Sequence, residues 1–308
     1  MRFSIFQDTD IGARSSNQDR MGYCFSRESL LMIVADGMGG HMRGEVAAQL
    51  SMQTVAAMFQ QAAQPRLQDP AAFLDESFRA GHRELHRYRE AHGLPECPRT
   101  TIVACIIQDN MAWWAHAGDS RLYLMRRGKL VTRTRDHSKV ENLLNLGLIT
   151  QAQTETHPER NKVLNCLGSP FEPSIEVHAQ YPLRPADVIL LCSDGFWSGT
   201  DEVEMARELN EEPVMDVVPR LVRKAVQHNG ATADNTSALA RQWDSEAVVD
   251  DIPTLSSLGL PDGAITTTIA IGVNPGPETE PTDLTEDEIE RTIAEIQNAI
   301  QRSNRESR

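Results

Sequence analysis

Short apolar runs separated by turn-forming residues make up much of the first 242 positions. Runs of this length, rich in Val, Ile and Leu and bounded by Gly, Asn or Asp, are typical of β-strands. Turn signals stand at 109–110 (Asp-Asn) and 127–128 (Arg-Gly), each between two such runs. The pattern predicts strands at residues 3–7, 22–25, 30–35, 100–107, 111–115, 121–125, 129–131, 174–179, 188–192 and 236–242.

Other stretches follow the 3.6-residue period of an amphipathic helix. Residues 44–58 place their apolar side chains on one side, and a Gln- and Pro-rich break at 60–70 separates them from a second predicted helix at 71–91. One or two further helices are expected within 201–227. Residues 138–170 follow neither period and are expected to form a helical or loop excursion.

Two histidines in the second predicted helix have the spacing of a metal clip. His82 and His86 are four residues apart, so both side chains would lie on one helix face. Arginines surround them at positions 79, 83, 87 and 89. A solvated, charged helix face is therefore the favoured interpretation of this segment.

The composition changes after residue 242. Residues 244–283 hold eight carboxylates and no Lys or Arg, as expected of an acidic linker, with one further strand conceivable at 264–273. An amphipathic helix is predicted at 285–300, where a capping box precedes a stripe of four isoleucines (Ile289, Ile293, Ile296 and Ile300). Three partners for that stripe stay open: its own domain, another protein, or a second copy in a coiled coil. We therefore divide the chain into a domain at 1–242 and a tail at 243–308.

Composition narrows the class of protein. The 308 residues are 40% apolar, enough for a substantial core, and the formal net charge of −14 argues against nucleic acid or an anionic membrane as the main partner. Five cysteines without a CxxC pair suggest buried thiols in a reducing compartment. No secretory signal or apolar span is evident, so we expect no membrane span and a cytoplasmic location.

Acidic motifs recur in order along the predicted domain. They are RSSNQD (14–19), ADGMGG (35–40), AGDSR (117–121), CSDG (192–195) and ADN (233–235). Each sets an Asp beside a Gly, Ser or Asn, and three of these aspartates follow an apolar run. Carboxylates aimed into one cleft repel one another unless a hard cation neutralises them. The pattern therefore indicates an oxygen-ligated metal site.

Taken together, these motifs resemble those of the metal-dependent serine/threonine protein phosphatases of the protein phosphatase 2C type, in their bacterial form. Thr100-Thr101, DHS (136–138) and HPERN (157–161) extend the match, which covers residues 1–242 and does not reach the tail. The resemblance implies an α+β fold, a four-layer α-β-β-α sandwich of two mainly antiparallel sheets flanked by helices. It also implies a flap at about 138–170 and a centre of two or three Mn²⁺ or Mg²⁺ ions.

The resemblance also implies a role for individual residues of these motifs. Asp36 would bridge both metals, and the carbonyl of Gly37 would bind one of them. Asp194 and Asp234 would hold the other. A water bridging the two metals would be the nucleophile.

Three further residues are carried over from the same motifs. Asp19 would act through water on the metal, Asp119 would help to bind a third, weaker ion, and Arg14 would bind the substrate phosphate through its guanidinium fork. Where some relatives have a Glu, this chain has Gln18, which cannot donate a carboxylate.

The acid that protonates the leaving oxygen is not assigned by the sequence. Many eukaryotic relatives carry a His where this chain has Met38, and a thioether cannot transfer a proton. His41 or a water on the metal is the alternative. In the flap, Arg160 and Asn161 are expected either to touch a phosphopeptide or to stitch the flap internally.

The expected function is metal-dependent hydrolysis of phosphoserine and phosphothreonine on proteins, opposing a bacterial Ser/Thr kinase. Phosphoprotein substrates and that kinase are the expected partners. A pseudophosphatase would lack ligands, whereas Arg14 and all five aspartates are present. A third alternative keeps the enzyme and makes the tail its regulator, so deleting 244–308 would change the rate or the partners.

Overall fold

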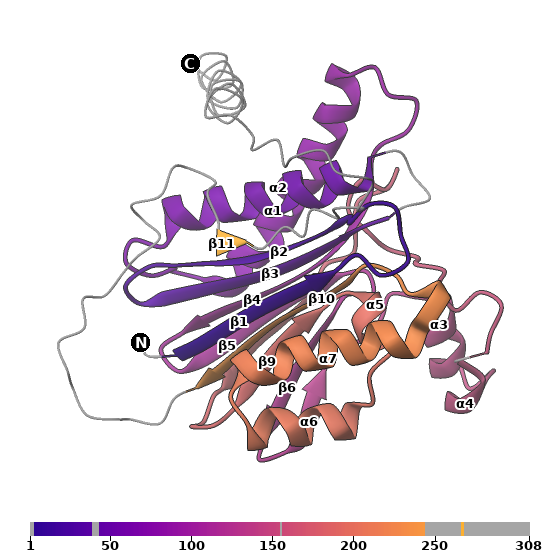
Figure 1. The fold of residues 1–308 in the computed structure, drawn as a ribbon. Helices are drawn as coiled ribbons and strands as arrows, with labels where there is room; N and C mark the ends of the chain where they lie inside the picture. The colour runs from indigo at the N-terminus through magenta and orange to yellow at the C-terminus, as the bar shows by residue number, and fades with distance from the viewer. Residues whose placement is uncertain (1–2, 39–42, 155, 244–265, 268–308) are drawn as a thin grey trace, which may run out of the picture. The chain divides into compact units, whose positions relative to one another are not determined.

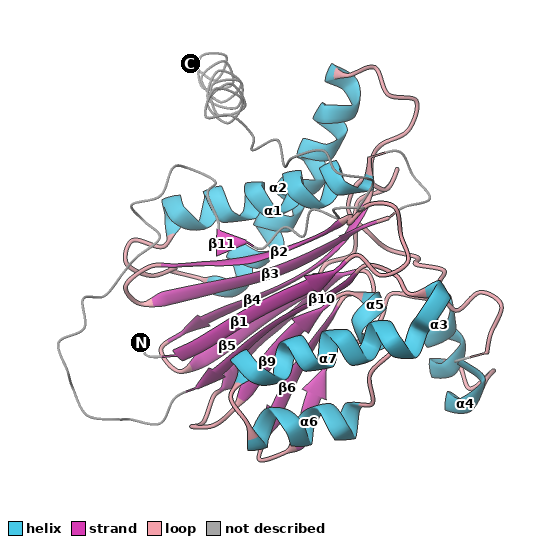
Figure 2. Cartoon of the chain, in the orientation of Figure 1, coloured by secondary structure: helices cyan, strands magenta, loops and turns pink. Residues whose placement is uncertain are grey.

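The computed structural model describes residues 3–38, 43–154, 156–243 and 266–267. All of them belong to one compact unit, Met1–Gly272, which is distinct from a second unit, Val273–Arg308. In the first unit two antiparallel sheets lie face to face, and helices cover the outer face of each (Figure 1, Figure 2). The expected α-β-β-α sandwich is thereby confirmed.

Sheet A has five strands in the order β1-β10-β9-β6-β7. Its first and last strands in sequence are neighbours, because β1 pairs with β10 along its whole length, from Phe3 opposite Trp243 to Asp10 opposite Thr236. The strands are β1 (Phe3–Asp10), β6 (Arg121–Arg126), β7 (Lys129–Arg133), β9 (Val188–Cys192) and β10 (Thr236–Trp243).

Sheet B has six strands in the order β11-β2-β3-β4-β5-β8. Its centre is a meander, in which each strand from β2 to β5 pairs with the next one along the chain. The strands are β2 (Asp19–Phe25), β3 (Ser29–Gly37), β4 (Thr100–Gln108), β5 (Met111–Ala117), β8 (Glu176–Pro182) and the short β11 (Thr266–Thr267).

Helices form the outer layers (Figure 1). Helices α1 (Gly44–Ala62) and α2 (Pro70–Ala91) cover sheet B, and α5 (Asp194–Trp197), α6 (Glu202–Glu211) and α7 (Val214–Asn229) cover sheet A. The excursion carries α3 (Lys139–Asn145) and α4 (Gln151–Thr154), and a 3-10 turn, η1 (Gly230–Thr232), follows α7. The start of α2 is fixed by Asp69, whose carboxylate accepts hydrogen bonds from the backbone N–H groups of Ala71 and Ala72.

Strand β3 shows why its residues read as a continuous apolar run. Leu31, Ile33 and Ala35 pack against α1 and α2, whereas the alternating residues Leu30, Met32 and Val34 pack between the two sheets. A strand that is buried on both faces needs apolar side chains at every position. Burying that apolar surface is the main favourable term that holds the four layers together.

The predicted order of strands and helices is confirmed from residue 3 to residue 243, with most elements longer than predicted. Helix α5 was not predicted, because four residues are too few to show a period. Strand β11 lies within the stretch 264–273, and the predicted helix 285–300 lies outside the described residues. Cys24, Cys105 and Cys192 are buried free thiols, as their apolar surroundings in the sequence suggest, and Cys97 and Cys166 are buried and free as well. Within the described chain, no helix is both long and apolar enough to span a membrane.

The expectation of a solvated histidine face on α2 was wrong for His82. This side chain is only 4% exposed, and its Nδ1 accepts a hydrogen bond of 3.1 Å from the backbone N–H of Gly168. His86 contacts the next residue through a hydrogen bond of 2.9 Å between its Nε2 and the carbonyl of Ser169. The two histidines therefore hold the end of the 138–170 excursion against α2.

Candidate metal centre

The aspartates of the five motifs meet at one end of the two sheets. Asp19 opens β2 and pairs directly with Asp36 near the end of β3. Asp119 lies in the turn between β5 and β6, Asp194 is the first residue of α5, and Asp234 stands just before β10. Antiparallel pairing brings these element ends together, although the residues are far apart in sequence.

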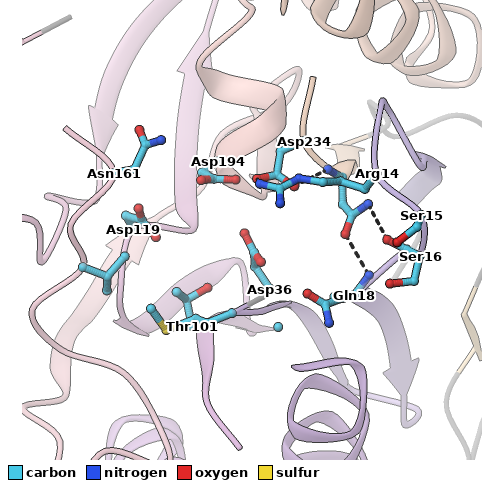
Figure 3. Close-up of a pocket in the computed structure, with 14 residues that line it drawn as sticks. Arg14, Ser15, Ser16, Gln18, Asp36, Thr101, Asp119, Asn161, Asp194 and Asp234 are labelled. Atoms are coloured by element: carbon cyan, nitrogen blue, oxygen red, sulfur yellow. Dashed lines mark hydrogen bonds and ion pairs between the residues drawn. The ribbon is translucent and has the colours of Figure 1, made fainter. Parts of the chain in front are cut away.

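A cavity of about 370 Å³ opens at this end. Six of the seven predicted site residues line it: Arg14, Asp36, Gly37, Asp119, Asp194 and Asp234. Figure 3 shows the carboxylates of Asp36, Asp194 and Asp234 turned toward a common space, with Asp119 across from them. The seventh residue, Asp19, does not line the cavity, but it pairs with Asp36 between β2 and β3.

The carboxylates raise one another's pKa. Burial and the neighbouring carboxylates hold the pKa of Asp36 well above its ordinary value of 3.8, with Asp19 and Asp194 the strongest neighbours. Burial and Asp194 do the same for Asp119. The pKa of Asp194 is raised to about 6 by burial and by Asp234. A site in which four carboxylates repel one another has the electrostatics of a cation site.

Asp19 gives the clearest test of whether a cation fits. Its side chain is 5% exposed, and neither carboxylate oxygen has a hydrogen-bond partner of good geometry among the described residues. The nearby hydroxyls of Ser193 and Ser237 offset only part of the cost of burial, so the pKa is raised to about 7. A buried carboxylate is normally paired or bound to a metal. All-oxygen ligands of this kind suit Mg²⁺ or Mn²⁺, so the residues present fit the expected ions.

Gly37 allows the close approach of two chain segments beside Asp36. A Cβ atom at this position would lie 2.2 Å from the carbonyl oxygen of Gly44, which opens α1, and 2.9 Å from that of Gln18. No side chain can be accommodated at such distances. Thr100 supports the same segment, because its hydroxyl donates a 2.8 Å hydrogen bond to the carbonyl of Asp36.

Asn235 holds the loop that carries Arg14, a role that the sequence did not reveal. Its side-chain Oδ1 accepts a hydrogen bond from the backbone N–H of Gln18, and its Nδ2 donates to the carbonyls of Ile11 and Ser16. The guanidinium of Arg14 reaches over the cavity and donates to Asp234 (Figure 3). The position of Asn235 directly after Asp234 was the available signal. A side-chain amide buried beside a candidate metal ligand needs hydrogen-bond partners, which here are backbone groups of the Arg14 loop.

The excursion at 138–170 contributes one side of the cavity. Asn161 and Val163 line it, whereas Arg160 does not. An isolated bridge between Ser138 and Val163 closes the base of the excursion. Of the two residues predicted to touch a substrate or to stitch the flap, only Asn161 thus reaches the cavity wall.

A second group of ligand-type side chains, His116, His137 and Glu176, does not line this cavity. His137 Nδ1 accepts a hydrogen bond of 3.2 Å from the backbone N–H of Gly118. The ring proton must therefore stay on Nε2, which faces Glu176 at 3.5 Å. A protonated nitrogen has no lone pair for a cation, so this arrangement suits a loop support better than a metal site.

The metal-free chain is expected to lose stability as the pH rises. Because the pKa is raised to about 7 for Asp19 and about 6 for Asp194, the folded chain holds protons that the unfolded chain has released. This stabilisation is complete below about pH 4, near the pKa of an unfolded Asp. It is lost as the pH rises through the pKa values that the two groups have in the folded chain. In EDTA we expect a lower Tm at pH 8 than at pH 5, and Mn²⁺ should raise the Tm most at pH 8. An equally large drop in an Asp19→Asn variant would contradict this origin.

The sequence of the domain matches one family model. That model, described as Protein phosphatase 2C, covers residues 7–241. The chain belongs to the protein phosphatase 2C family. The expected family is thereby confirmed. The expected enzyme class, a protein phosphatase, is the class of this family. The matched segment contains all seven predicted site residues.

Relatives of this phosphatase-family chain come from several bacteria. It is 32% identical over 231 residues to the serine/threonine protein phosphatase PstP of Mycobacterium tuberculosis, which is 75% of this chain but only 43% of PstP. The chain thus spans less than half the length of that relative. It is 31% identical over 241 residues to the serine/threonine phosphatase stp of Listeria monocytogenes, covering 77% of this chain and 94% of stp.

A solved structure supports both the fold and the choice of metal. The catalytic domain of PstP, in complex with two manganese ions, aligns with a TM-score of 0.66 and 29% identity. The alignment covers 79% of this chain and 99% of that domain. The family therefore includes a close fold relative that holds two ions of one of the metals expected here.

Proposed function

We propose that the chain hydrolyses phosphoserine and phosphothreonine on proteins with the help of two Mn²⁺ or Mg²⁺ ions. One observation carries the proposal: four carboxylates converge on a single cavity whose rim bears a guanidinium, Arg14. Carboxylates supply the ligands for hard cations, and a guanidinium supplies a fork for phosphate oxygens. The membership of the family and the manganese-bound relative support the same activity.

Each aspartate then has its own role. Asp36, toward which the other carboxylates lie, would contact both ions, and the carbonyl of Gly37 would complete one ligand set. Asp194 and Asp234 would hold the second ion. Asp119, across the cavity, would bind a weaker third ion, and Asp19 would act mainly through metal-bound water.

The chain's own residues bind and orient the substrate. When bound, the ions would supply an activated water and neutralise charge on the phosphoryl oxygens. Arg14 is 55% exposed at its side chain, so its guanidinium can turn from Asp234 toward a phosphate. Asn235 holds the loop that carries Arg14, which fixes the direction from which the phosphate is bound. Asn161 lies on the flap side of the cavity, where it can contact the peptide.

The proton for the leaving oxygen has no histidine donor among the described side chains that line the cavity. Met38 is one of them and cannot donate, and none of them is a histidine. His41 lies outside the described residues. Its assignment as the acid stays a prediction.

The proposed setting is the reversal of a bacterial Ser/Thr kinase in the cytoplasm. The acidic surface charge of the whole chain, with a formal net charge of −14, favours protein substrates over nucleic acid. The proposed catalytic domain is 1–242. The tail at 243–308 stays open as a docking or regulatory segment.

Metal dependence is the test of this proposal. The full chain should hydrolyse p-nitrophenyl phosphate and a phosphothreonine peptide when Mn²⁺ is present. Activity should fall to background in EDTA and return when excess Mn²⁺ is added. A chain that binds Mn²⁺ and the phosphopeptide but releases no phosphate would be a pseudophosphatase. Hydrolysis that resists EDTA would contradict the metal mechanism.

A further inference from the structure

The turn that presents Asp119 is held from two sides. It consists of Gly118, Asp119 and Ser120, between β5 and β6. Gly118 has φ = +124°, and a Cβ there would lie 2.4 Å from Cβ of Thr101. The turn therefore lies directly against β4, and only glycine can be accommodated at position 118. Its remaining polar groups decide where the carboxylate of Asp119 points.

His137 holds the first side of the turn. Its backbone N–H donates a 2.9 Å hydrogen bond to the carbonyl of Gly118, and its ring Nδ1 accepts one of 3.2 Å from the N–H of the same residue. Asn165, at the end of the flap, also lies 2.7 Å from that ring nitrogen. Both backbone polar groups of Gly118 are thus satisfied by one residue.

Trp197 holds the second side. Its indole Nε1–H donates a 2.8 Å hydrogen bond to the backbone carbonyl of Asp119. Trp197 is the last residue of α5, and Asp194 is the first residue of that same single turn of helix. The hydrogen bond therefore connects the backbone of Asp119 to the short element that carries Asp194.

Arg121 fixes the indole ring in place. Its guanidinium lies over the ring of Trp197, with 3.7 Å between its carbon and the ring centroid. The same guanidinium makes a two-pronged ion pair with Asp136, at 2.8 and 2.7 Å. An arginine that is paired on one edge and stacked on its face is well ordered, so the indole has little freedom to turn away from Asp119.

We propose that Trp197 is a positioning residue that sets the distance between the carboxylates of Asp119 and Asp194. It acts through the carbonyl of Asp119, and it thereby sets the affinity for the weakly held third ion that we assign to Asp119. This inference rests on the proposed function, because it concerns the third ion of that centre. The indole N–H donates to Asp119 and to none of Asp36, Asp194 or Asp234, so the two tightly held ions should bind independently of it.

The experiment compares Trp197→Phe with the unchanged full chain. Phenylalanine keeps a ring beneath Arg121 but loses the N–H donor. Binding of Mn²⁺, followed by calorimetry, should show the weakest binding event weakened about threefold to tenfold, the usual cost of one hydrogen bond. The tighter events should keep their affinities. The Mn²⁺ concentration that gives half-maximal hydrolysis should rise by the same factor.

A matched variant controls for the loss of an indole. Trp113 lies on β5, is 7% exposed and packs among apolar side chains on the α1/α2 side of sheet B. Trp113→Phe should leave every Mn²⁺ affinity unchanged. The Tm of each variant in EDTA shows whether it is folded before its binding is compared.

A double-mutant cycle separates positioning from general support of the fold. In an Asp119→Asn background, Trp197→Phe should cause no further loss of Mn²⁺ affinity, because its effect is transmitted through Asp119. Additive losses, or an unchanged weak binding event in Trp197→Phe alone, would overturn the inference. Failure of the unchanged chain to bind Mn²⁺ or to hydrolyse phosphate would instead overturn the proposed function.

Discussion

Replacing Asp36 with asparagine is expected to lower kcat on p-nitrophenyl phosphate on the order of a thousandfold or more, the scale of losing a central electrostatic group. Asparagine has nearly the same shape but carries no charge. Burial and the charges of four neighbouring carboxylates raise the pKa of Asp36, so its charge is coupled to the whole group. The site would therefore lose the ligand that we propose both ions share, and calorimetry should show that Mn²⁺ binding is lost with it.

A surface aspartate provides the matched control for this loss. Asp75 lies on α2, is 38% exposed at its side chain and pairs with Arg79. Asp75→Asn removes the same charge outside the cavity and should leave kcat within about twofold, because an exposed ion pair contributes little. Near-normal, EDTA-resistant hydrolysis by Asp36→Asn would show that the proposed centre is not where the reaction occurs.

Replacing Arg14 with alanine is expected to lower kcat/KM by about tenfold to a hundredfold, the range for losing one or two hydrogen bonds to a charged group. Most of the effect should appear in KM, because on our proposal the guanidinium would bind phosphate both before and during the reaction. Arg14→Lys should recover part of the loss, since it keeps the charge but not the fork. Phosphate should also inhibit the alanine variant less strongly than the unchanged chain.

An exposed arginine away from the cavity is the appropriate comparison. Arg66 is 57% exposed at its side chain and pairs with Asp109, so Arg66→Ala should leave kcat/KM unchanged. A loss in Arg14→Ala that lies wholly in kcat, with KM and phosphate inhibition unaffected, would contradict a role in binding phosphate. Arg14 would then act mainly through Asp234, its partner in the structure.

The aspartates of the site could be predicted because each carries a local signal. Asp36 and Asp194 follow apolar runs and precede glycines, so their positions at element ends are visible in the sequence itself. The element order could be predicted for the same reason, since each strand has its own pattern. The pairing of β1 with β10 could not be predicted, because no local pattern indicates which strands become neighbours.

Residues whose role depends on a distant partner could not be predicted. Asn235 bonds to a residue 217 positions away, and Trp197 to one 78 positions away. His82 was expected in solvent because arginines flank it, yet Gly168 returns from the flap and buries it. Periodicity describes which face of a helix is polar, but not which segment later packs on that face.

The pairing of β1 with β10 also has a consequence for how the chain is made. Along the described part of sheet A, β1 lies at the edge and has β10 as its neighbour. During synthesis, β1 therefore cannot pair in this sheet until residues 236–243 have left the ribosome. Arg14 follows β1 and Asp234 precedes β10, and the two form an ion pair. They therefore come together in the same late step. A nascent chain thus contains most of the carboxylates of the proposed metal centre before that centre can be completed. It should acquire activity only when the whole domain has been synthesised and has folded.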